Sequence, residues 1–229
     1  MLTAVIIPAL NEAGSIAGVV RDARAQDVDW VIVADNGSTD ETAERARQAG
    51  ALLVQEPRRG YGYACAAGTA KAVALGAQVL VYLDGDYSSL PAEMPRLLQP
   101  LKQEKADLVL GSRALGEIDE KAMLPHQRYG NQLSSWLIRR LYGVQVTDLG
   151  PYRAIRAELL QELDMREMTF GWPTEMMVKS ARRGARIVEV PVSWKQRLAG
   201  QSKVSGSVRG SILAATYILG VTLRYALFP

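Results

Sequence analysis

Cysteine and histidine are nearly absent from this chain of 229 residues, which contains one of each, Cys65 and His126. A single cysteine excludes a disulfide within the chain, and this is typical of proteins in a reducing compartment such as the cytoplasm. We interpret Cys65 as a small packing residue, because no pattern of histidine and carboxylate partners around it indicates a nucleophile. One histidine makes no metal site, so we interpret His126 as a polar loop residue.

An excess of either charge is also missing. The chain has 27 lysines and arginines against 24 aspartates and glutamates, which gives a formal net charge of +3. Such a mild balance permits anionic partners such as nucleotides, phosphates or lipid headgroups and selects none of them. We expect no nucleic-acid partner. The hydrophobic content of 48% and the length fit one soluble domain with a sizeable core.

No apolar run is long enough to cross a membrane. The C-terminal segment GSILAATYILGVTLRYALFP has only 14 residues between Arg209 and Arg224, whereas a spanning helix needs about 20. The N-terminal MLTAVIIPALNE lacks a basic region and a cleavage-site pattern, so it predicts a first strand and no signal peptide. We expect a domain over residues 1–208 and a short apolar helix over 209–229 that lies at a membrane interface, forms a dimer or packs on the domain.

Short apolar runs alternate with helical patterns through the first half of the chain. The predicted strands cover residues 4–7, 30–34, 52–55 and 79–83, and the predicted helices cover 12–25, 38–48 and 60–75. The second half predicts helices over 92–103, 131–142, 159–163 and 174–183, and strands over 107–110 and 186–191. Continuous apolar strands that alternate with helices indicate an α/β fold, with a mostly parallel sheet covered on both faces.

Polar side chains follow three of the predicted strands at the points where these strands end. They form the segments 8–12 (PALNE), 35–38 (DNGS) and 84–86 (DGD). In an open α/β sheet, ligands bind beyond the carboxyl ends of the strands, so we expect these segments to converge on one site. Each segment alone is explained equally well as a turn or a helix cap.

The segment LDGD places two carboxylates, Asp84 and Asp86, one residue apart in a turn. Like charges this close resist ionising together unless a cation compensates them. Oxygen ligands suit Mg²⁺ or Mn²⁺, and Mg²⁺ usually takes one or two protein carboxylates and completes its shell with water and substrate phosphates. The pair therefore indicates a site for a metal and a diphosphate, although an Asp-x-Asp pattern alone is weak.

Several segments in order give the chain a family resemblance. VIIPALNE, VADNGSTDET, GYGYACAAGTAKA, LDGD and LVLGSR resemble family 2 glycosyltransferases of the GT-A fold, a Rossmann-like α/β fold. RYGNQLSSWLIRRLYGVQVTDLGPYRAIR, GWPTEMMVKSARRGARIVEVPV and GQSKVSG resemble the branch of dolichyl-phosphate mannose synthases and polyprenyl-phosphate sugar transferases. The similarity extends from about residue 3 to residue 208.

The resemblance implies a metal-dependent, inverting transfer of a hexose. The donor would be a nucleotide-sugar of the GDP-mannose or UDP-glucose type, and the acceptor a polyprenyl (dolichyl-like) phosphate. Mg²⁺ or Mn²⁺ would be the cofactor, and the enzyme would lie in the cytoplasm or peripherally at the cytoplasmic face of a membrane. A homodimer is an alternative use of the C-terminal helix.

The resemblance also assigns roles to single residues of this chain. The nucleoside pocket would contain Pro8, Leu10, Asn11, Glu12 and Asp35, with Asp35 contacting the base. Asp84 would also contact the nucleotide, and with Asp86 it would bind the metal and the sugar diphosphate. These two aspartates, Arg113 and Glu175 would be the catalytic residues.

On the acceptor side, the resemblance assigns residues that grip phosphate. They are Gly111, Ser112, Arg113, Arg128, Asn131, Asp148, Arg153, Arg197, Ser202 and Lys203. Arg197, Ser202 and Lys203 match a mobile basic loop that closes over phosphate. Guanidinium groups suit this task because they bind phosphate in a bidentate manner. The acceptor is already anionic, so no strong general base is needed.

Structural roles are alternatives for several of these residues. Arg128 and Lys203 are then surface charges, Asp148 and Arg153 a structural ion pair, and Glu175 a support behind the site. We interpret Trp136 and Trp172 as packing residues. The chain also departs from the branch in several places: Ser88 stands where a glutamine is usual, Leu90 where an aspartate is usual, and TDLGPYR where TDxxSGFR is usual.

Two other functions remain open at this stage. The same kind of enzyme could act on a soluble acceptor, which the absence of the branch's membrane anchors favours. A non-catalytic nucleotide-binding module is the other alternative, which Asp84 and Asp86 argue against.

Overall fold

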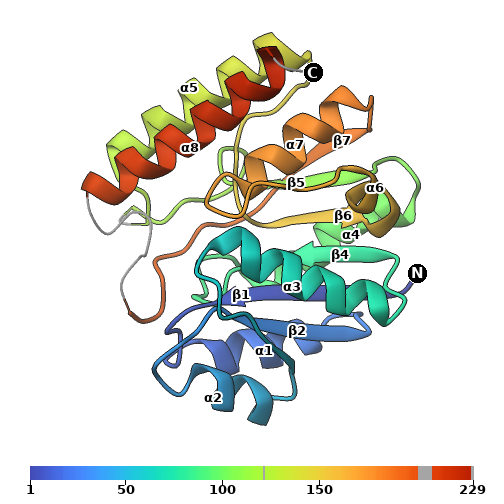
Figure 1. Cartoon of the computed structure of the whole chain (residues 1–229), viewed down its shortest axis with the longest axis vertical. Helices are drawn as coiled ribbons and strands as arrows, with labels where there is room; N and C mark the ends of the chain where they lie inside the picture. The colour runs from blue at the N-terminus through green and yellow to red at the C-terminus, as the bar shows by residue number, and fades with distance from the viewer. Residues whose placement is uncertain (121, 201–207, 228–229) are drawn as a thin grey trace.

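A computed structural model describes residues 1–120, 122–200 and 208–227, with side chains described outside 208–212. Its centre is a seven-stranded sheet in the order β3-β2-β1-β4-β6-β5-β7 (Figure 1). The strands are β1 (Thr3–Ala9), β2 (Trp30–Asp35), β3 (Leu52–Gln55), β4 (Val79–Tyr82), β5 (Leu108–Ser112), β6 (Arg153–Arg156) and β7 (Ile187–Pro191). Of these described strands, only β6 runs antiparallel to its neighbours, β4 and β5. The predicted α/β fold with a mostly parallel sheet is confirmed.

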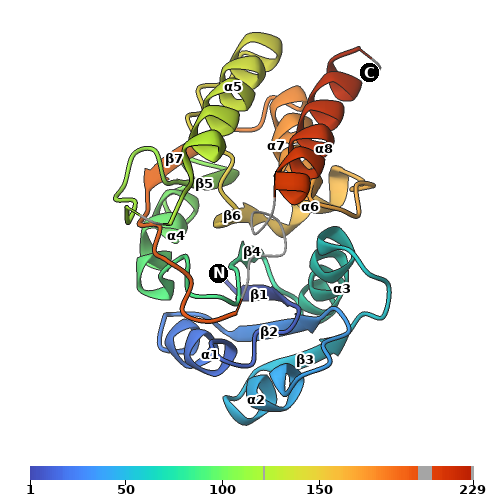
Figure 2. The ribbon, with the colours of Figure 1, turned by 90° about the vertical axis from the view of Figure 1, so that its left-hand side faces the viewer.

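Helices cover both faces of the sheet. They are α1 (Ile16–Arg24), α2 (Thr42–Gln48), α3 (Tyr61–Ala74), α4 (Met94–Lys102), α5 (Pro125–Tyr142), α6 (Ala157–Glu162), α7 (Trp172–Arg182) and α8 (Val208–Leu227), with a 3₁₀ turn η1 (Pro91–Glu93) before α4. Helices α1 and α4 lie on one side of the sheet, and α3, α6 and α7 lie on the other (Figure 2). Parallel strands need crossover helices, so a parallel sheet becomes buried on both faces.

Alternate residues of the strands supply two separate cores. In β1, Val5 and Ile7 face α1 and α4, whereas Ala4 and Ile6 face the α3 side. Cys65 is fully buried in the second core, which confirms its role in packing. Gly68 allows α3 to lie close to the sheet, since a Cβ there would come within 2.5 Å of Ile6. The close approach fixes the amino end of α3 beside the carboxyl ends of β1 and β4.

Some elements differ from the sequence prediction. Strand β6 was not predicted, because its four residues RAIR carry arginines at both ends. Helix α5 begins at Pro125, six residues before the predicted start at residue 131. Proline suits the first turn of a helix, and the Gln127 side chain accepts a hydrogen bond from the Leu124 amide at 2.8 Å. His126 is therefore helical, and its interpretation as a loop residue was wrong.

The two tryptophans in question lie in different environments. Trp172 is 3% exposed at the start of α7, as expected for a packing residue. Trp136 is 49% exposed on α5, so its interpretation as a packing residue was wrong. An amphipathic pattern gives the period of a helix and leaves open which face is covered.

Helices α5 and α8 run parallel beside each other and project beyond the sheet (Figures 1 and 2). Helix α8 corresponds to the apolar helix expected over residues 209–229. It is attached to the domain by the Tyr142 hydroxyl, which donates to the carbonyl of Thr222, and by the Tyr225 hydroxyl, which donates to Glu175 Oε1 at 2.6 Å. Within the described part of the chain, no helix has the length and apolar character needed to span a membrane.

Candidate functional site

A cavity of about 520 Å³ opens at the carboxyl ends of β1, β2 and β4. Each of the three predicted polar segments contributes to its wall, so their convergence on one site is confirmed. The predicted site residues that line it are Pro8, Leu10, Glu12, Asp84, Asp86, Arg113, Asn131 and Arg197. A second hollow of about 760 Å³ lies at the amino ends of the strands, beside Met1 and Gln78, and includes none of the predicted residues.

Asp84 and Asp86 line the cavity and follow β4 and Leu83 in the chain. Burial, followed by the charge of Asp86, raises the pKa of Asp84 to about 7. The Tyr61 hydroxyl partly opposes this rise by donating a hydrogen bond to Asp84 Oδ1 at 3.3 Å. A cation bound beside the two carboxylates would offset their mutual repulsion.

Ser88 supports Asp86 from behind. Its backbone N–H donates to Asp86 Oδ1 at 2.9 Å, and its hydroxyl donates to the same oxygen. Ser88 is 3% exposed, so it does not extend into the cavity. The serine that departs from the family pattern therefore fixes the orientation of a carboxylate.

Arg197 places a positive charge beside Asp86 and Glu12. Its Nη2 atom lies 2.7 and 2.9 Å from the two carboxylate oxygens of Glu12 and 3.5 Å from Asp86 Oδ2. The backbone N–H of Leu198 donates to the carbonyl of Asp86 at 3.0 Å, so this segment lies along the DGD turn. Ser202 and Lys203, which the sequence analysis placed in the same basic loop, lie outside the described residues.

The acidic residues fit a hard divalent cation that is shared with a substrate. Among the described residues, no group of three or more histidine, cysteine, aspartate or glutamate side chains is placed to bind a metal. Asp84 and Asp86 provide oxygen ligands alone, which suits Mg²⁺ or Mn²⁺ when phosphate oxygens and water complete the shell. Any metal bound here therefore depends on its substrate for most of its ligands.

On the side expected to bind the nucleoside, Pro8 and Leu10 line the cavity, whereas Asn11 and Asp35 lie beside it. Asp35 is 6% exposed and accepts hydrogen bonds from the Ser38 amide, at 3.2 Å, and from the Ser38 hydroxyl. Asn11 has a positive φ of 53° and its Oδ1 accepts a bond from the Thr39 amide at 2.8 Å. These two residues shape the turn after β2.

Two cavity residues near this turn received no role of their own in the sequence analysis: Asn36, which belongs to the predicted DNGS segment, and Arg59. Asn36 is buried, and its amide nitrogen donates to the carbonyls of Glu56 and Arg58 at 3.0 and 2.6 Å. Its Oδ1 accepts a bond from the Gly60 amide at 2.9 Å. These bonds fix the loop that brings Arg59 to the cavity wall. The position of Asn36 in the DNGS segment was the signal available in the sequence.

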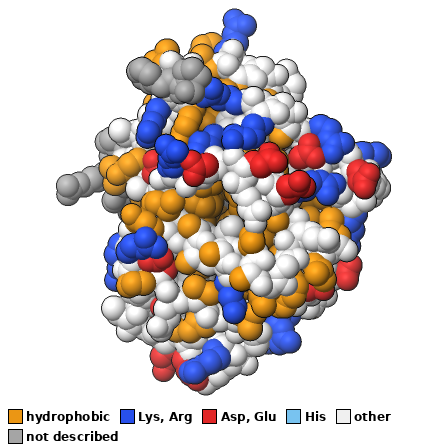
Figure 3. Space-filling model, turned by 45° about the vertical axis from the view of Figure 1, so that its right-hand side comes forward, with side chains coloured by type: hydrophobic (Ala, Val, Ile, Leu, Met, Phe, Trp, Pro, Cys, Tyr) orange, Lys and Arg blue, Asp and Glu red, His pale blue; other side chains and the backbone are white. Residues whose placement is uncertain are grey.

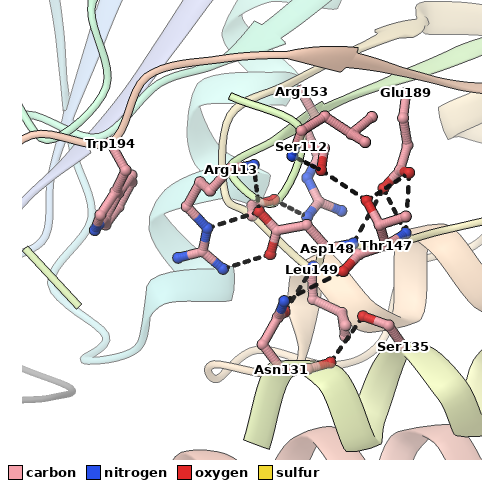
Figure 4. A network of polar contacts seen from close by, with 12 residues as sticks. Ser112, Arg113, Asn131, Ser135, Thr147, Asp148, Leu149, Arg153, Glu189 and Trp194 are labelled. Carbon is pink, nitrogen blue, oxygen red and sulfur yellow. Dashed lines mark hydrogen bonds and ion pairs between the residues drawn. The ribbon is translucent and has the colours of Figure 1, made fainter. Parts of the chain in front are cut away.

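Arg113 contributes a polar part of the cavity wall, on the side expected to bind the acceptor. Its Nε and Nη2 atoms donate to Asp148 Oδ2 and Oδ1, both at 2.7 Å, and its backbone N–H donates to Oδ2 at 2.7 Å. Its guanidinium also lies over the Trp194 ring, 4.8 Å from the centroid (Figure 4). Burial acts to raise the pKa of Asp148, but the charge and hydrogen bonds of Arg113 outweigh it and lower that pKa below its usual value.

Arg153 and Asp148 do not form the pair that the sequence analysis considered, because Asp148 is bound by Arg113. Arg153 is 1% exposed and donates to the backbone carbonyls of Pro173, at 2.6 Å, and Gly150. Burial lowers the pKa of Arg153 to about 10. Arg153 and Asp148 both lie behind the cavity wall, as does Ser112, whose hydroxyl is 2.8 Å from that of Thr147.

Glu175 and Arg128 lie away from the cavity. Glu175 is fully buried and accepts bonds from Lys179 at 2.8 Å, from Tyr225, and from the backbone amides of Arg166 and Glu167. Burial acts to raise the pKa of Glu175, but these hydrogen bonds outweigh it and lower the pKa. Arg128 is exposed on α5. Catalytic and phosphate-binding roles for these residues stay predictions.

Comparison with known proteins identifies the fold first. Glucosyl-3-phosphoglycerate synthase from Mycobacterium tuberculosis, in complex with Mn²⁺, UDP-glucose and phosphoglyceric acid, superposes with a TM-score of 0.78 at 22% identity. The alignment covers 100% of this chain and 80% of that chain. The fold is therefore the GT-A-like fold that the resemblance predicted.

The family follows from the sequence. The profile described as "Glycosyl transferase family 2" matches residues 4–164, and the chain belongs to this family. An uncharacterized glycosyltransferase of Mycobacterium tuberculosis (strain ATCC 25618 / H37Rv) is 38% identical over 210 residues, which are 92% of this chain and 93% of that protein. An undecaprenyl-phosphate mannosyltransferase of Micrococcus luteus is 32% identical over 237 residues, covering 96% and 94%. The protein is thus a hexosyltransferase-like enzyme of family 2.

Proposed function

We propose that the enzyme transfers a hexose, with inversion and with the help of Mg²⁺ or Mn²⁺, from a nucleotide-sugar to a polyprenyl phosphate. The observation that carries the proposal is the composition of the cavity at the carboxyl ends of the strands. Carboxylates and guanidinium groups line it, among them Asp84, Asp86 and Arg113. Apolar side chains such as Ala214 and Ile218 of α8 line it as well, whereas α5 contributes polar side chains such as Asn131 and Ser134. A lipid phosphate likewise combines an anionic head with an apolar chain. The similarity to an undecaprenyl-phosphate mannosyltransferase supports the same acceptor class.

In this proposal the residues of the chain act mainly by charge and position. Pro8 and Leu10 contact the nucleoside, and Asp84 and Asp86 would hold the metal, whose positive charge would stabilise the departing diphosphate. Arg113 orients the acceptor phosphate, whose oxygen attacks the anomeric carbon from the face opposite the leaving group. The bond to the nucleoside diphosphate breaks as the new glycosidic bond forms, and this inverts the configuration. The phosphate needs no base because it is already ionised.

The apolar part of the cavity fits the first isoprene units of the acceptor. Its wall includes Met123, Leu149, Pro151, Phe170, Pro173, Ala214 and Ile218. These side chains come from the loop before α5, the segments that flank β6 and α7, and helix α8. Burial of apolar surface contributes about 25 cal/mol per Å². An isoprene chain bound in this part of the cavity therefore gains affinity that an acceptor without an apolar chain lacks.

The proposal is tested by measuring release of nucleoside diphosphate and formation of glycosyl phosphoprenol. UDP- and GDP-hexoses are each combined with Mn²⁺ or Mg²⁺ and a short-chain prenyl phosphate, and the matching prenyl alcohol is the control. We expect turnover with the phosphate and none with the alcohol. Turnover with a small hydroxylated metabolite instead would establish a soluble acceptor, and donor binding without any turnover would establish a non-catalytic module.

Helices α5 and α8 present an apolar surface, which we call the α5–α8 face. It comprises the exposed side chains of Tyr129, Leu133, Trp136, Leu213 and Leu223. On α5 the buried positions are Ser134, Ser135 and Ile138, so this helix buries two serines while Leu133 and Trp136 stay exposed. By contrast, acidic and basic side chains intermingle on the face shown in Figure 3. An exposed apolar stripe of this kind marks an interaction site.

Charge favours a membrane as the partner of this face. Residues 125–142 and 208–227 include no aspartate or glutamate in the sequence, and Arg128, Arg140 and Arg224 are exposed beside the apolar side chains. A basic, apolar pair of helices suits the interface of an anionic bilayer. The same two helices also contribute to the cavity wall, through Ser134 of α5 and Ala215 of α8. We therefore place the enzyme peripherally on a membrane, at its cytoplasmic face.

We expect the double variant Leu133→Ser/Trp136→Ser to lose at least about tenfold in its partition onto anionic vesicles, because each apolar side chain contributes about 1.5–3 kcal/mol when buried. Flotation on phosphatidylcholine vesicles with and without phosphatidylglycerol measures this. Leu52→Ser, which changes a leucine 38% exposed on β3, is the matched control. If the double substitution separates a dimer in sedimentation velocity and leaves flotation unchanged, the α5–α8 face is a dimer surface.

A further prediction concerns Arg197, which compensates the charge of Glu12 and Asp86. Arg197→Gln is expected to tighten binding of free Mn²⁺ about tenfold when no nucleotide is present. Two unit charges about 4 Å apart interact by about 4 kcal/mol in a partly buried site, and exchange with solvent cancels part of this. Titration calorimetry with Mn²⁺ measures the affinity, with Arg166→Gln as a control in an exposed ion pair. Equal or weaker Mn²⁺ binding by Arg197→Gln would show that the arginine does not compete with the cation.

A further inference from the structure

The segment 144–152, which joins α5 to β6, forms neither helix nor strand. Its buried backbone amides therefore need acceptors outside regular secondary structure. Glu189 of β7 provides them, since its carboxylate accepts the Thr147 amide at 2.8 and 2.9 Å and the Asp148 amide at 3.1 Å. The Thr147 hydroxyl donates to Glu189 Oε2 at 2.8 Å. A single side chain thus binds three donors of two consecutive residues.

The contacts of Glu189 continue through Asp148 to Arg113 (Figure 4), and Arg113 lines the cavity. Asp148, whose amide is bound to Glu189, grips the guanidinium of Arg113 in a bidentate pair. Asn131 of α5 closes the turn from the opposite side, because its Oδ1 accepts the Leu149 amide at 3.0 Å. Glu189 itself is absent from the cavity wall. Its contacts reach the cavity through Asp148 and Arg113, and also through Thr147, whose carbonyl accepts a bond from Asn131 Nδ2 at 3.3 Å.

We infer that Glu189 is a positioning residue: it fixes the turn at residues 147–149 so that Asp148 holds Arg113 toward the acceptor phosphate. The inference rests on the proposed function for the identity of that phosphate. The chemistry of the carboxylate supports this inference, because three hydrogen-bond donors face its two oxygens, and these oxygens accept hydrogen bonds and cannot donate them. A glutamine would turn an NH₂ group toward at least one N–H or O–H donor. The turn would then shift, and Arg113 would lose its fixed direction.

The test uses Glu189→Gln with two readouts. The first is the emission of Trp194, on which Arg113 lies; it is isolated by subtracting the spectrum of the same protein with Trp194→Phe. The second is the KM for a short-chain prenyl phosphate. We expect a changed Trp194 emission and a KM at least tenfold higher, because displacement of a binding group by about 1 Å is costly. The KM for the nucleotide-sugar should stay within about twofold.

Asp107→Asn is the matched control. Asp107 binds Arg186, the residue before β7, through Nε at 2.9 Å and Nη2 at 2.6 Å, whereas Glu189 lies in the middle of the strand. This control should change neither readout. If Glu189→Gln leaves the Trp194 emission and the acceptor KM equal to those of Asp107→Asn, the inference is overturned. If Glu189→Gln does not fold, Thr147→Val is used instead, because it removes one of the three donors. It must then change the Trp194 emission and the acceptor KM in the same direction but by less.

A second arm tests whether Glu189 acts through Arg113. Combined with Arg113→Lys, Glu189→Gln should add less than twofold to the rise in acceptor KM, whereas independent effects would multiply. Full multiplication would overturn the inference. The fluorescence arm needs no substrate. If wild-type protein transfers nothing to prenyl phosphate but Glu189→Gln alters Trp194, the positioning role stands and the proposed acceptor falls.

Discussion

Asp86→Asn is expected to lower kcat/KM about a thousandfold, because it removes one of the two carboxylates that would hold the metal against the diphosphate. Loss of one group that stabilises charge in a transition state typically costs a factor of about 100 to 1,000, and here the metal is lost with it. The substitution is nearly isosteric. The side-chain oxygen of the introduced asparagine can still accept the bonds from Ser88, so the DGD turn should keep its shape.

The thermal midpoint of Asp86→Asn should equal or slightly exceed that of the wild type. Asp86 lies beside Asp84 and Glu12, and removing one negative charge relieves their repulsion. Release of nucleoside diphosphate and a thermal melt measure the two effects. Asp27→Asn, at an aspartate 93% exposed and paired with Lys102, should leave both unchanged. Wild-type turnover by Asp86→Asn would refute the assignment of the metal site.

The sequence was sufficient to predict the parallel part of the fold, because the patterns that indicate it lie within short segments of the chain. Apolar runs such as that of β1 can be buried only between two layers of helices, and polar residues placed just after strands must share one edge of the sheet. Strand β6 was not predicted because its formation depends on the neighbouring strands and has no local pattern to indicate it. Its residues RAIR show no period, and the strand exists because β4 and β5 leave a gap between them that it fills.

Charge pairing at the site could not be predicted from spacing. Arg197 and Glu12 are 185 residues apart in sequence, and only the fold brings the loop after β7 to the turn after β1. The choice of Arg113 as partner for Asp148 is equally a result of the fold, since Arg153 is nearer in sequence. Glu189 did offer a signal. A single carboxylate inside the apolar strand IVEVP needs a partner when it is buried.

Arg113→Met is expected to lower the free energy of unfolding by about 3–5 kcal/mol at pH 7, in addition to abolishing transfer. Asp148 is 1% exposed, and an ionised carboxylate that loses its partner at such a site costs about this much. The exposed pair of Arg186 and Asp107 has the same bidentate geometry. Its side chains are 54% and 22% exposed, so Arg186→Met should cost less than about 1 kcal/mol. Urea unfolding of both variants measures the difference.

The pH dependence distinguishes lost charge compensation from lost packing. In the wild type Arg113 lowers the pKa of Asp148, so the pair stabilises the fold above the usual aspartate pKa and this contribution is lost as the pH falls through the lowered value. In Arg113→Met the guanidinium is missing, so burial raises the pKa of Asp148. The cost of burying an ionised carboxylate without its partner is then present at neutral pH, and it disappears as the carboxyl group becomes protonated. The difference in the free energy of unfolding between the wild type and Arg113→Met should therefore decrease from pH 7 toward pH 4. The double variant Arg113→Met/Asp148→Asn should regain most of the loss at pH 7, and equal instability of the single and double variants would assign the loss to packing against Trp194.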